Sequence, residues 1–395
     1  MKKSTLWIAL SLCILGTSAF ANECLDRIDT HLYNRDTLDL SDCKINDNDM
    51  QKVAEYLHSN YTVFNIILDD NDISEQGIGY LKDIGSISWI SLSNNKLGSY
   101  GAYLVAQMPG LQTLSIDDNN IGDAGANALA RNSTITQLSA ENNNITGEGI
   151  SALATHPTVW NLRVGHNRFN KAALTALSNN KHLRWLDVRD SNISADDVNA
   201  LMSHTKTLEL LILDNNPIGN KGIETIAQKG KLNLLSAEGC AVGDDGAIAA
   251  AKMQNLYDLD LENNHISDLG ASALAKTKIS MIFLGDNQIS SEGAKEFANT
   301  KIDGLFLNHN NIGNSGALAL ARNTSLRYLM IRYNHIDQDG VDALHNSAIG
   351  DVDTQGNVPY EAPDKSAHMT LVKAKNPLLR VKDDKYASFL NKHSK

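Results

Sequence analysis

The most regular feature of the chain is a hydrophobic and polar pattern that recurs about every 24 residues. Residues 111–134 read LQTLSIDDNNIGDAGANALARNST, and residues 135–158 repeat the same order. In L-x-x-L-x-L the last two leucines lie on one side of an extended strand, because side chains alternate along a strand. The Gly and the Leu-Ala that follow are typical of a short helix with one buried face. Each repeat therefore predicts a strand, a turn and a short helix.

A polar position after each strand, called here the ladder position, marks the repeats. Its side-chain amide can satisfy backbone groups at the turn, and an unmade pairing of this kind costs about 1–3 kcal/mol. The first spacing between ladder positions is 28 residues and the others are 23–25. Fourteen repeats over residues 37–357 follow from this spacing. The ladder positions are Cys43, Asn71, Asn95, Asn119, Asn143, Asn167, Ser191, Asn216, Cys240, Asn264, Asn287, Asn310, Asn334 and Asn357.

The repeats are expected to stack into a single α/β solenoid. One 24-residue unit buries too few apolar side chains to fold alone, so its neighbours must complete the core. Stacking places the strands in a parallel sheet on the concave face and the short helices on the convex face. A glycine six residues after most ladder positions, such as Gly125, lets each helix approach the next one closely.

These residues resemble the leucine-rich-repeat family, and the half-repeat N-x-I-G-D-x-G-A-x-A-L-A resembles its ribonuclease-inhibitor-like branch. The resemblance covers residues 37–357. It implies a horseshoe that binds proteins on its concave sheet, with shorter convex helices than that branch usually has.

The N-terminal residues 1–21 have the order of a secretory signal peptide. Lys2 and Lys3 precede an apolar run, and Ala19-Phe20-Ala21 is a small-residue cleavage site. Cleavage after Ala21 predicts a secreted or periplasmic protein, and the short Lys-Lys start is typical of bacteria. The alternative is an N-terminal membrane anchor, although the apolar run is short for a membrane span.

The two flanks of the array are expected to differ. Residues 22–36 place Leu25, Ile28 and Leu32 at helical spacing, which predicts a cap helix over the first repeat. Residues 358–395 form a basic, proline-interrupted tail that either caps the last repeat or is disordered. Cys24, Cys43 and Cys240 remain after cleavage. Either Cys24 and Cys43 form a disulfide, which export permits, or all three are buried thiols.

The charge of the body narrows the class of partner. The chain carries a net charge of −11. Without Lys2, Lys3 and the tail's excess of four positive charges, residues 22–357 carry about −17. Phosphate binding needs clustered Lys and Arg, so the acidic body disfavours nucleic acid and anionic lipid as partners. An acidic body is compatible with a basic protein partner.

Two groups of outward strand residues are candidate partner-binding sites. One is an apolar group in the C-terminal third, and exposed aromatic residues are favoured anchors of protein interfaces. Alternatively, these side chains cover one another or the tail covers them. The other is a central group of Arg and Trp residues, whose arginines could instead pair with Asp187 and Asp190. The first group is Met281, Phe283, Phe306, Tyr328, Met330 and Tyr333, and the second is Arg163, Trp185 and Arg189.

Catalytic and metal-binding patterns are weak in this sequence. There is no serine-hydrolase elbow, zinc-protease helix, P-loop or C-x-x-C motif. His309 and Asp286 form a candidate pair on neighbouring repeats, with no third member. A row of acidic positions lacks the spacing of a calcium loop, which favours a solvated face over a metal site. The row consists of Asp69, Asp117, Glu141, Asp214, Glu238 and Glu262.

These patterns predict an exported, non-catalytic scaffold without cofactor or metal that recognises a protein partner through its concave face. Such a protein could act as a virulence or effector-type factor or as an envelope interaction protein. Two alternatives from other classes are a hydrolase with a site on the concave face and an envelope structural protein anchored by its tail. Neither stable membrane insertion nor nucleic-acid binding is expected, and the oligomeric state stays open.

Overall fold

A computed structural model describes residues 23–33 and 36–358 of the chain. The predicted signal peptide and the predicted basic tail lie outside these described residues. The structure divides after Leu183 into two compact units, and each is described by itself.

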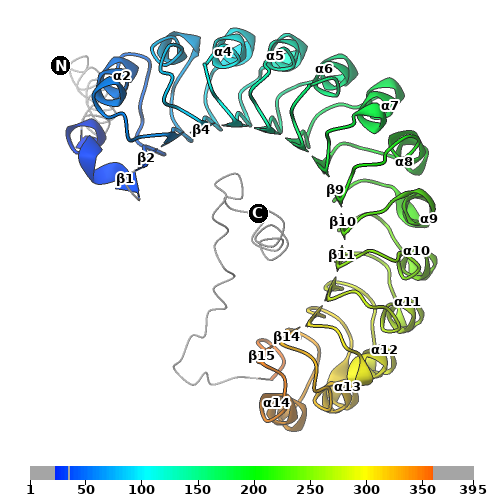
Figure 1. Cartoon of the computed structure of the whole chain (residues 1–395). Coiled ribbons are helices and arrows are strands. Elements are labelled where there is room, and N and C mark those ends of the chain that lie inside the picture. The colour runs from blue at the N-terminus through cyan, green and yellow to red at the C-terminus, as the bar shows by residue number, and fades with distance from the viewer. Residues whose placement is uncertain (1–22, 34–35, 359–395) are drawn as a thin grey trace, which may run out of the picture. The chain divides into compact units, whose positions relative to one another are not determined.

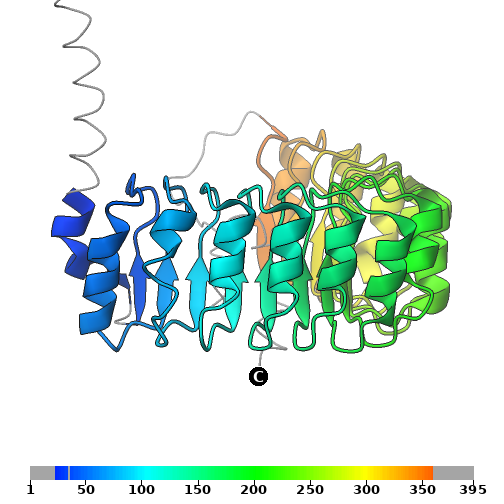
Figure 2. The ribbon, with the colours of Figure 1, turned by 90° about the horizontal axis from the view of Figure 1, so that it is seen from above.

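The first unit is a stack of strand-turn-helix repeats, with strands along the inner edge of its arc and helices along the outer edge (Figure 1). Seen from above, its helices stand side by side in front of the strands (Figure 2). The strands are β1 (Leu32–Tyr33), β2 (Thr37–Asp39), β3 (Asn65–Ile67), β4 (Trp89–Ser91), β5 (Thr113–Ser115), β6 (Gln137–Ser139) and β7 (Asn161–Arg163). The helices are η1 (Ile28–His31), α2 (Met50–Ser59), α3 (Glu75–Ile78), α4 (Gly98–Val105), α5 (Gly122–Leu129), α6 (Gly147–Leu153) and α7 (Lys171–Asn179).

The second unit repeats this arrangement, again with helices on the outer side of its strands (Figure 1). Its strands are β8 (Trp185–Asp187), β9 (Leu210–Ile212), β10 (Leu234–Ser236), β11 (Asp258–Asp260), β12 (Met281–Phe283), β13 (Gly304–Phe306), β14 (Tyr328–Met330) and β15 (Asp351–Asp353). Its helices are α8 (Ala195–Leu201), α9 (Gly219–Lys229), α10 (Asp244–Ala250), α11 (Asp268–Leu274), α12 (Ser291–Glu296), η2 (Phe297–Asn299), α13 (Gly313–Leu320) and α14 (Gln338–His345).

Within each unit the three-residue strands pair in parallel and in sequence order. Strands β2 to β7 pair through the first unit and β8 to β15 through the second. The middle residue of each strand points toward the helices, and Leu114, Leu138 and Leu162 are buried in one such row. This confirms the predicted leucine-rich-repeat solenoid, with a parallel sheet on one face and short helices on the other.

The helix glycines keep neighbouring repeats close. A Cβ atom added to Gly125 would lie 2.7 Å from Ile121 and 3.0 Å from Ala102 of the preceding repeat. Because real Cβ atoms do not approach other atoms that closely, a larger residue would push α4 and α5 apart. The recurrent glycine therefore sets the helix spacing, as the pattern predicted.

The ladder residues connect successive repeats through their side chains. Asn143 Nδ2 donates to the carbonyl oxygens of Ile116 (2.8 Å) and Glu141 (2.9 Å), while its Oδ1 accepts from the backbone N–H groups of Asn119 (3.0 Å) and Ile121 (3.2 Å). Cys240 and Ser191, which replace asparagine at two ladder positions, make fewer of these hydrogen bonds. The thiol of Cys240 lies 3.2 Å from the Leu213 carbonyl, and the hydroxyl of Ser191 donates to the carbonyl of Arg189.

A disulfide between Cys24 and Cys43 closes the N-terminal end of the first unit, and Cys240 is a buried free thiol. One of the two arrangements left open by the sequence is therefore present. Residues 23–31 form helical turns, but the segment then becomes β1 and pairs antiparallel with β2. The predicted cap helix thus ends earlier than residue 36, because β1 hydrogen-bonds to the otherwise open edge of β2.

Candidate binding surface on the sheet

The first and third residues of each strand point away from the helices and form rows across each sheet. In the second unit Met281, Gly304 and Tyr328 are register partners in one row. Phe283, Phe306 and Met330 are register partners in the next. The structure thus brings five members of the predicted C-terminal group, all except Tyr333, together on three adjacent strands.

Three members of this group are packed rather than exposed. Phe283, Phe306 and Met330 form an apolar cluster and are only 5%, 8% and 9% exposed. The rings of Phe283 and Phe306 stack with centroids 4.1 Å apart. Met281 packs against the cluster and lies over Gly304, where an added Cβ would be 2.7 Å from the Met281 sulfur. The prediction that these residues are exposed is wrong for Phe283, Phe306 and Met330, because they cover one another.

The exposed part of the C-terminal group consists of two tyrosines. Tyr328 is 38% exposed and Tyr333 is 47% exposed. The ring of Tyr333 stacks on that of His309, with centroids 4.5 Å apart. Tyr328 begins β14, whereas Tyr333 lies in the turn after it, in the left-handed backbone region. A partner can therefore reach two aromatic side chains, one on β14 and one in the turn that follows it.

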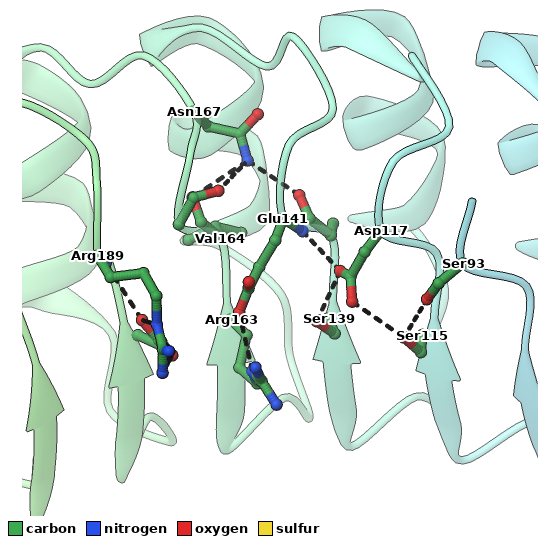
Figure 3. A network of polar contacts seen from close by, with 12 residues as sticks. Ser93, Ser115, Asp117, Ser139, Glu141, Arg163, Val164, Asn167 and Arg189 are labelled. Atoms are coloured by element: carbon green, nitrogen blue, oxygen red, sulfur yellow. Dashed lines mark hydrogen bonds and ion pairs between the residues drawn. The ribbon is translucent and has the colours of Figure 1, made fainter. Parts of the chain in front are cut away.

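The central group divides between the two units, and both of its arginines are held by carboxylates. Arg163 ends β7 in the first unit, and its Nε donates to Glu141 Oε1 at 3.0 Å (Figure 3). Arg189 belongs to the second unit and makes a two-atom contact with Asp187, from Nε at 3.0 Å and from Nη2 at 2.6 Å. Asp187 is fully buried. These arginines therefore neutralise neighbouring acids, as the alternative interpretation predicted for Asp187.

Trp185 is also more buried than an exposed interface anchor would be. It begins β8, its side chain is almost fully buried, and its indole Nε1 lacks a hydrogen-bond partner among residues 36–358. An indole N–H usually finds a partner when buried. Trp185 is therefore a packed residue of the outward row, and its indole N–H group makes no hydrogen bond within the described residues.

Two aspartates of the acidic row, Asp69 and Asp117, connect neighbouring repeats, a role that the sequence analysis did not predict. Asp117 accepts hydrogen bonds from the Ser139 hydroxyl at 2.7 Å and from the backbone N–H of Glu141 at 2.7 Å (Figure 3). Asp69 makes the same two contacts with Ser91 and Ser93 of its next repeat. The signal in the sequence was the serine 22 residues after each of these aspartates. These carboxylates bind the following strand instead of forming a solvated face.

Burial changes the acid strength of this row. Burial raises the pKa of the Asp117 carboxyl, although the Arg163 charge and the bound hydroxyl and N–H groups oppose that change. In the second unit burial, together with the nearby charge of Asp260, raises the pKa of Asp214 to about 7. A carboxyl kept from ionising in this way stores unfavourable free energy at neutral pH.

Three acids in the second unit are close enough to share a cation. Glu238, Asp260 and Glu262 each have one ligand atom within 4.8 Å of the others. Carboxylate oxygens are the ligands that Ca²⁺ prefers, but acidic groups at such distances are common in proteins without metal. The other close group is Cys24, His31 and Cys43, whose cysteines are joined in the disulfide.

His309 of the candidate catalytic pair, His309 and Asp286, makes its ring contact with Tyr333. The imidazole of His309 lies face to face with the ring of Tyr333, and both residues sit in turns after their strands. The arrangement is an aromatic stack at the edge of the C-terminal group.

No helix within residues 23–33 and 36–358 has the length and hydropathy of a membrane-spanning segment.

Comparisons with known proteins agree with this architecture. The family model described as Leucine Rich repeat matches seven segments of the chain, namely residues 37–54, 108–130, 131–154, 204–227, 252–275, 300–321 and 322–344. No curated protein matches the chain.

Two solved structures are similar to this chain. The chain is 22% identical to an internalin, InlF, from Listeria monocytogenes, with a TM-score of 0.51, and the match covers 75% of this chain and 82% of that one. It is 17% identical to the LRR ectodomain of the receptor kinase GASSHO1/SCHENGEN3 from Arabidopsis thaliana, solved in complex with CASPARIAN STRIP INTEGRITY FACTOR 2. That match has a TM-score of 0.46 and covers 77% of this chain and 42% of the receptor chain.

The ladder asparagines, the helix glycines and the parallel three-residue strands recur together through both units, and the family model matches in both. This chain carries leucine-rich repeats in both units and has the fold of a leucine-rich-repeat solenoid.

Proposed function

We propose that this protein is an exported, non-catalytic scaffold that binds a protein partner through the outward face of its sheet. Its repeats follow the ribonuclease-inhibitor-like pattern, and the predicted signal peptide supports a secreted or periplasmic bacterial protein. The observation that carries the proposal is the pair of exposed tyrosines, Tyr328 on β14 and Tyr333 in the turn after it, on the strand that contributes Met330 to the packed cluster.

The support for a protein partner is the chemistry of this surface. Within the second unit the helices lie on one side of the strands (Figure 1), and both tyrosines are exposed among the residues that the structure describes. Tyrosine offers a large apolar ring and a hydroxyl group at a low entropic cost, which makes it a frequent anchor at interfaces. We assign direct contact with the partner to Tyr328, Tyr333 and the edge of Met281.

The remaining candidate residues have a supporting place in the proposal. Phe283, Phe306 and Met330 pack together on β12, β13 and β14, and β14 also carries Tyr328. Arg163 in the first unit, and Trp185 and Arg189 in the second, are packed or already paired with acids, so their truncation should affect stability as well as any binding.

The test is a quantitative binding assay with a partner captured from the extracellular medium or the periplasm. The double substitution of Tyr328→Ala with Tyr333→Ala should weaken binding at least about tenfold, because each anchor typically contributes more than 1 kcal/mol. Tyr61→Ala is the matched control, since Tyr61 is an exposed tyrosine of the first unit. Equal binding by the double variant and the control would rule out this surface.

Export is tested separately by mass spectrometry of the protein from fractionated cells. We expect the mature chain to begin at Asn22 and to occur in the periplasm or the medium. A chain that keeps residues 1–21 and remains with the membrane fraction would contradict export by cleavage.

A further inference from the structure

A second candidate site lies in the first unit, on the helix side. A depression of about 460 Å³ lies between α4 and α5, which stand side by side (Figure 1). This volume falls within the range of about 300–1,000 Å³ that small-ligand sites occupy. Its lining includes the side chains of Ser99, Tyr100, Tyr103, Gln107, Asn127 and Arg131.

Two exposed tyrosines form the apolar wall of this depression. Tyr100 and Tyr103 are 60% and 48% exposed, and their rings stack with centroids 5.6 Å apart and 20° between the planes. Both project from α4, one helical turn apart. Together they offer an exposed, preformed aromatic surface to a flat apolar ligand face.

The polar groups of the depression provide both donors and acceptors. Gln107 Nε2 donates to the backbone carbonyl of Tyr103 at 3.2 Å, and Asn127 Nδ2 donates to the backbone carbonyl of Asp123 at 2.9 Å. The side-chain carbonyl oxygen of each amide is left for a ligand. The hydroxyls of Ser99, Tyr100 and Tyr103 can both donate and accept. A ligand with many hydroxyl groups matches this set better than one that only accepts hydrogen bonds.

The charge of the depression is positive in a chain of net charge −11. Its only charged lining residue is Arg131, whose guanidinium forms no ion pair with any residue in 23–33 or 36–358. The acid of α5, the helix that ends just before Arg131, is Asp123, and it accepts hydrogen bonds from Thr146 and Gly149 of the next repeat. A ligand carboxylate would therefore meet an arginine that is free to form a two-atom contact.

We propose that the depression between α4 and α5 binds an acidic oligosaccharide. A sugar ring lies on the tyrosines, its hydroxyls bond to Gln107 and Asn127, and the carboxylate of a uronate or sialate bonds to Arg131. This site is separate from the proposed partner surface on the sheet, so either proposal can fail without the other.

The experiment is calorimetric titration of the full protein with trigalacturonate and with sialyllactose, using maltotriose and lactose as matched neutral sugars. We expect at least one acidic sugar to bind at millimolar strength or better and at least about tenfold more tightly than its neutral control. Tyr103→Ala should abolish binding, and Arg131→Gln should remove the preference for the acidic sugar.

The control variant is Tyr80→Ala, because Tyr80 is an exposed tyrosine of the first unit that does not line the depression. It should bind like the unchanged protein, and thermal unfolding should show that all three variants are folded. Three outcomes would overturn the proposal. They are no binding of either acidic sugar at ~10 mM, binding that Tyr103→Ala leaves unchanged, and equal or tighter binding of a triglutamate peptide.

Discussion

Phe283 and Phe306 are register partners on β12 and β13, and their rings stack with centroids 4.1 Å apart and 16° between the planes. Both side chains point away from the helix layer, yet both are buried because they cover each other and Met330. The second unit therefore has a small apolar core on its outward face. This core separates residues that maintain the fold from residues that a partner can touch.

Replacement of Phe306 should lower stability more than it directly lowers binding. Phe306→Ala removes the stack with Phe283 and the contact with Met330, so we expect the free energy of unfolding to fall by about 2–4 kcal/mol. Tyr328→Ala should change it by no more than about 0.5 kcal/mol, because Tyr328 is exposed. Urea unfolding followed by circular dichroism measures both. Similar midpoints for the two variants would show that the cluster does not stabilise the unit.

His156 should make stability depend on pH. It occupies a position at which Asn132 and Asn180 each accept two backbone N–H groups and donate to the preceding repeat. The Nδ1 atom of His156 accepts from the backbone N–H groups of Thr158 (3.4 Å) and Val159 (3.3 Å). Burial lowers the pKa of His156 from 6.5 to about 4. The folded state therefore requires the neutral ring.

The unfolded chain binds a proton at His156 between pH 6.5 and 4, whereas the folded chain does not. The contribution of His156 to the free energy of unfolding is therefore fully present above pH 6.5 and is lost as the pH falls toward 4. His156→Asn keeps the acceptor without titrating, so at pH 5 the variant should be more stable than the unchanged protein by about 1–2 kcal/mol. Chemical unfolding at pH 7.5 and pH 5 measures this. The same loss on acidification in both proteins would refute the role of His156.

Asp214 should oppose stability at high pH. Burial raises its pKa from 3.8 to about 7, so the folded chain holds a proton that the unfolded chain releases. Stability therefore falls as the pH rises from 3.8 to 7 and is lowest above 7. Asp214→Asn still accepts from Ser236 and Glu238. It should stabilise the protein at pH 8 by at least about 1 kcal/mol, since one pKa unit corresponds to about 1.4 kcal/mol.

Asp123→Asn is the contrasting variant for this experiment. Burial favours the neutral form of Asp123, but hydrogen bonds from Thr146 and Gly149 outweigh it and lower the pKa of this carboxyl. Its charge therefore stabilises the folded state above pH 3.8, and its replacement should lower the melting temperature at pH 8. If both variants shift the melting temperature in the same direction, the burial argument for Asp214 is wrong.

The Cys24–Cys43 disulfide should stabilise the N-terminal end of the first unit. It joins residues 19 apart, and a loop of that size contributes about 3 kcal/mol through the entropy of the unfolded chain. Urea unfolding with and without reductant should show this difference. In the double variant of Cys24→Ser with Cys43→Ser the reductant should have no effect, since Cys240 is buried and unpaired. An unchanged midpoint for the natural chain under reductant would contradict the prediction.

The repeat itself was predictable from the sequence because its causes are local. Alternating leucines select a strand, the ladder asparagine closes its turn, and glycine such as Gly125 permits the close helix approach. Since each repeat contacts only its neighbours, the same local rules generate the whole stack. A second ladder at Asn132, Asn180 and Asn323 has the same regularity and could have been read from the sequence too.

The character of the candidate site depended on contacts between repeats. The sequence placed Phe283, Phe306 and Tyr328 in outward rows, but exposure is set by what lies on the neighbouring strand about 5 Å away. Phe283 and Phe306 face each other and are buried, while Tyr328 stands beside Gly304 and stays exposed. Arg163 likewise pairs with Glu141 of the preceding repeat, so its charge is not available to a partner. Local pattern decides which way a side chain points, and only tertiary packing decides whether a partner can reach it.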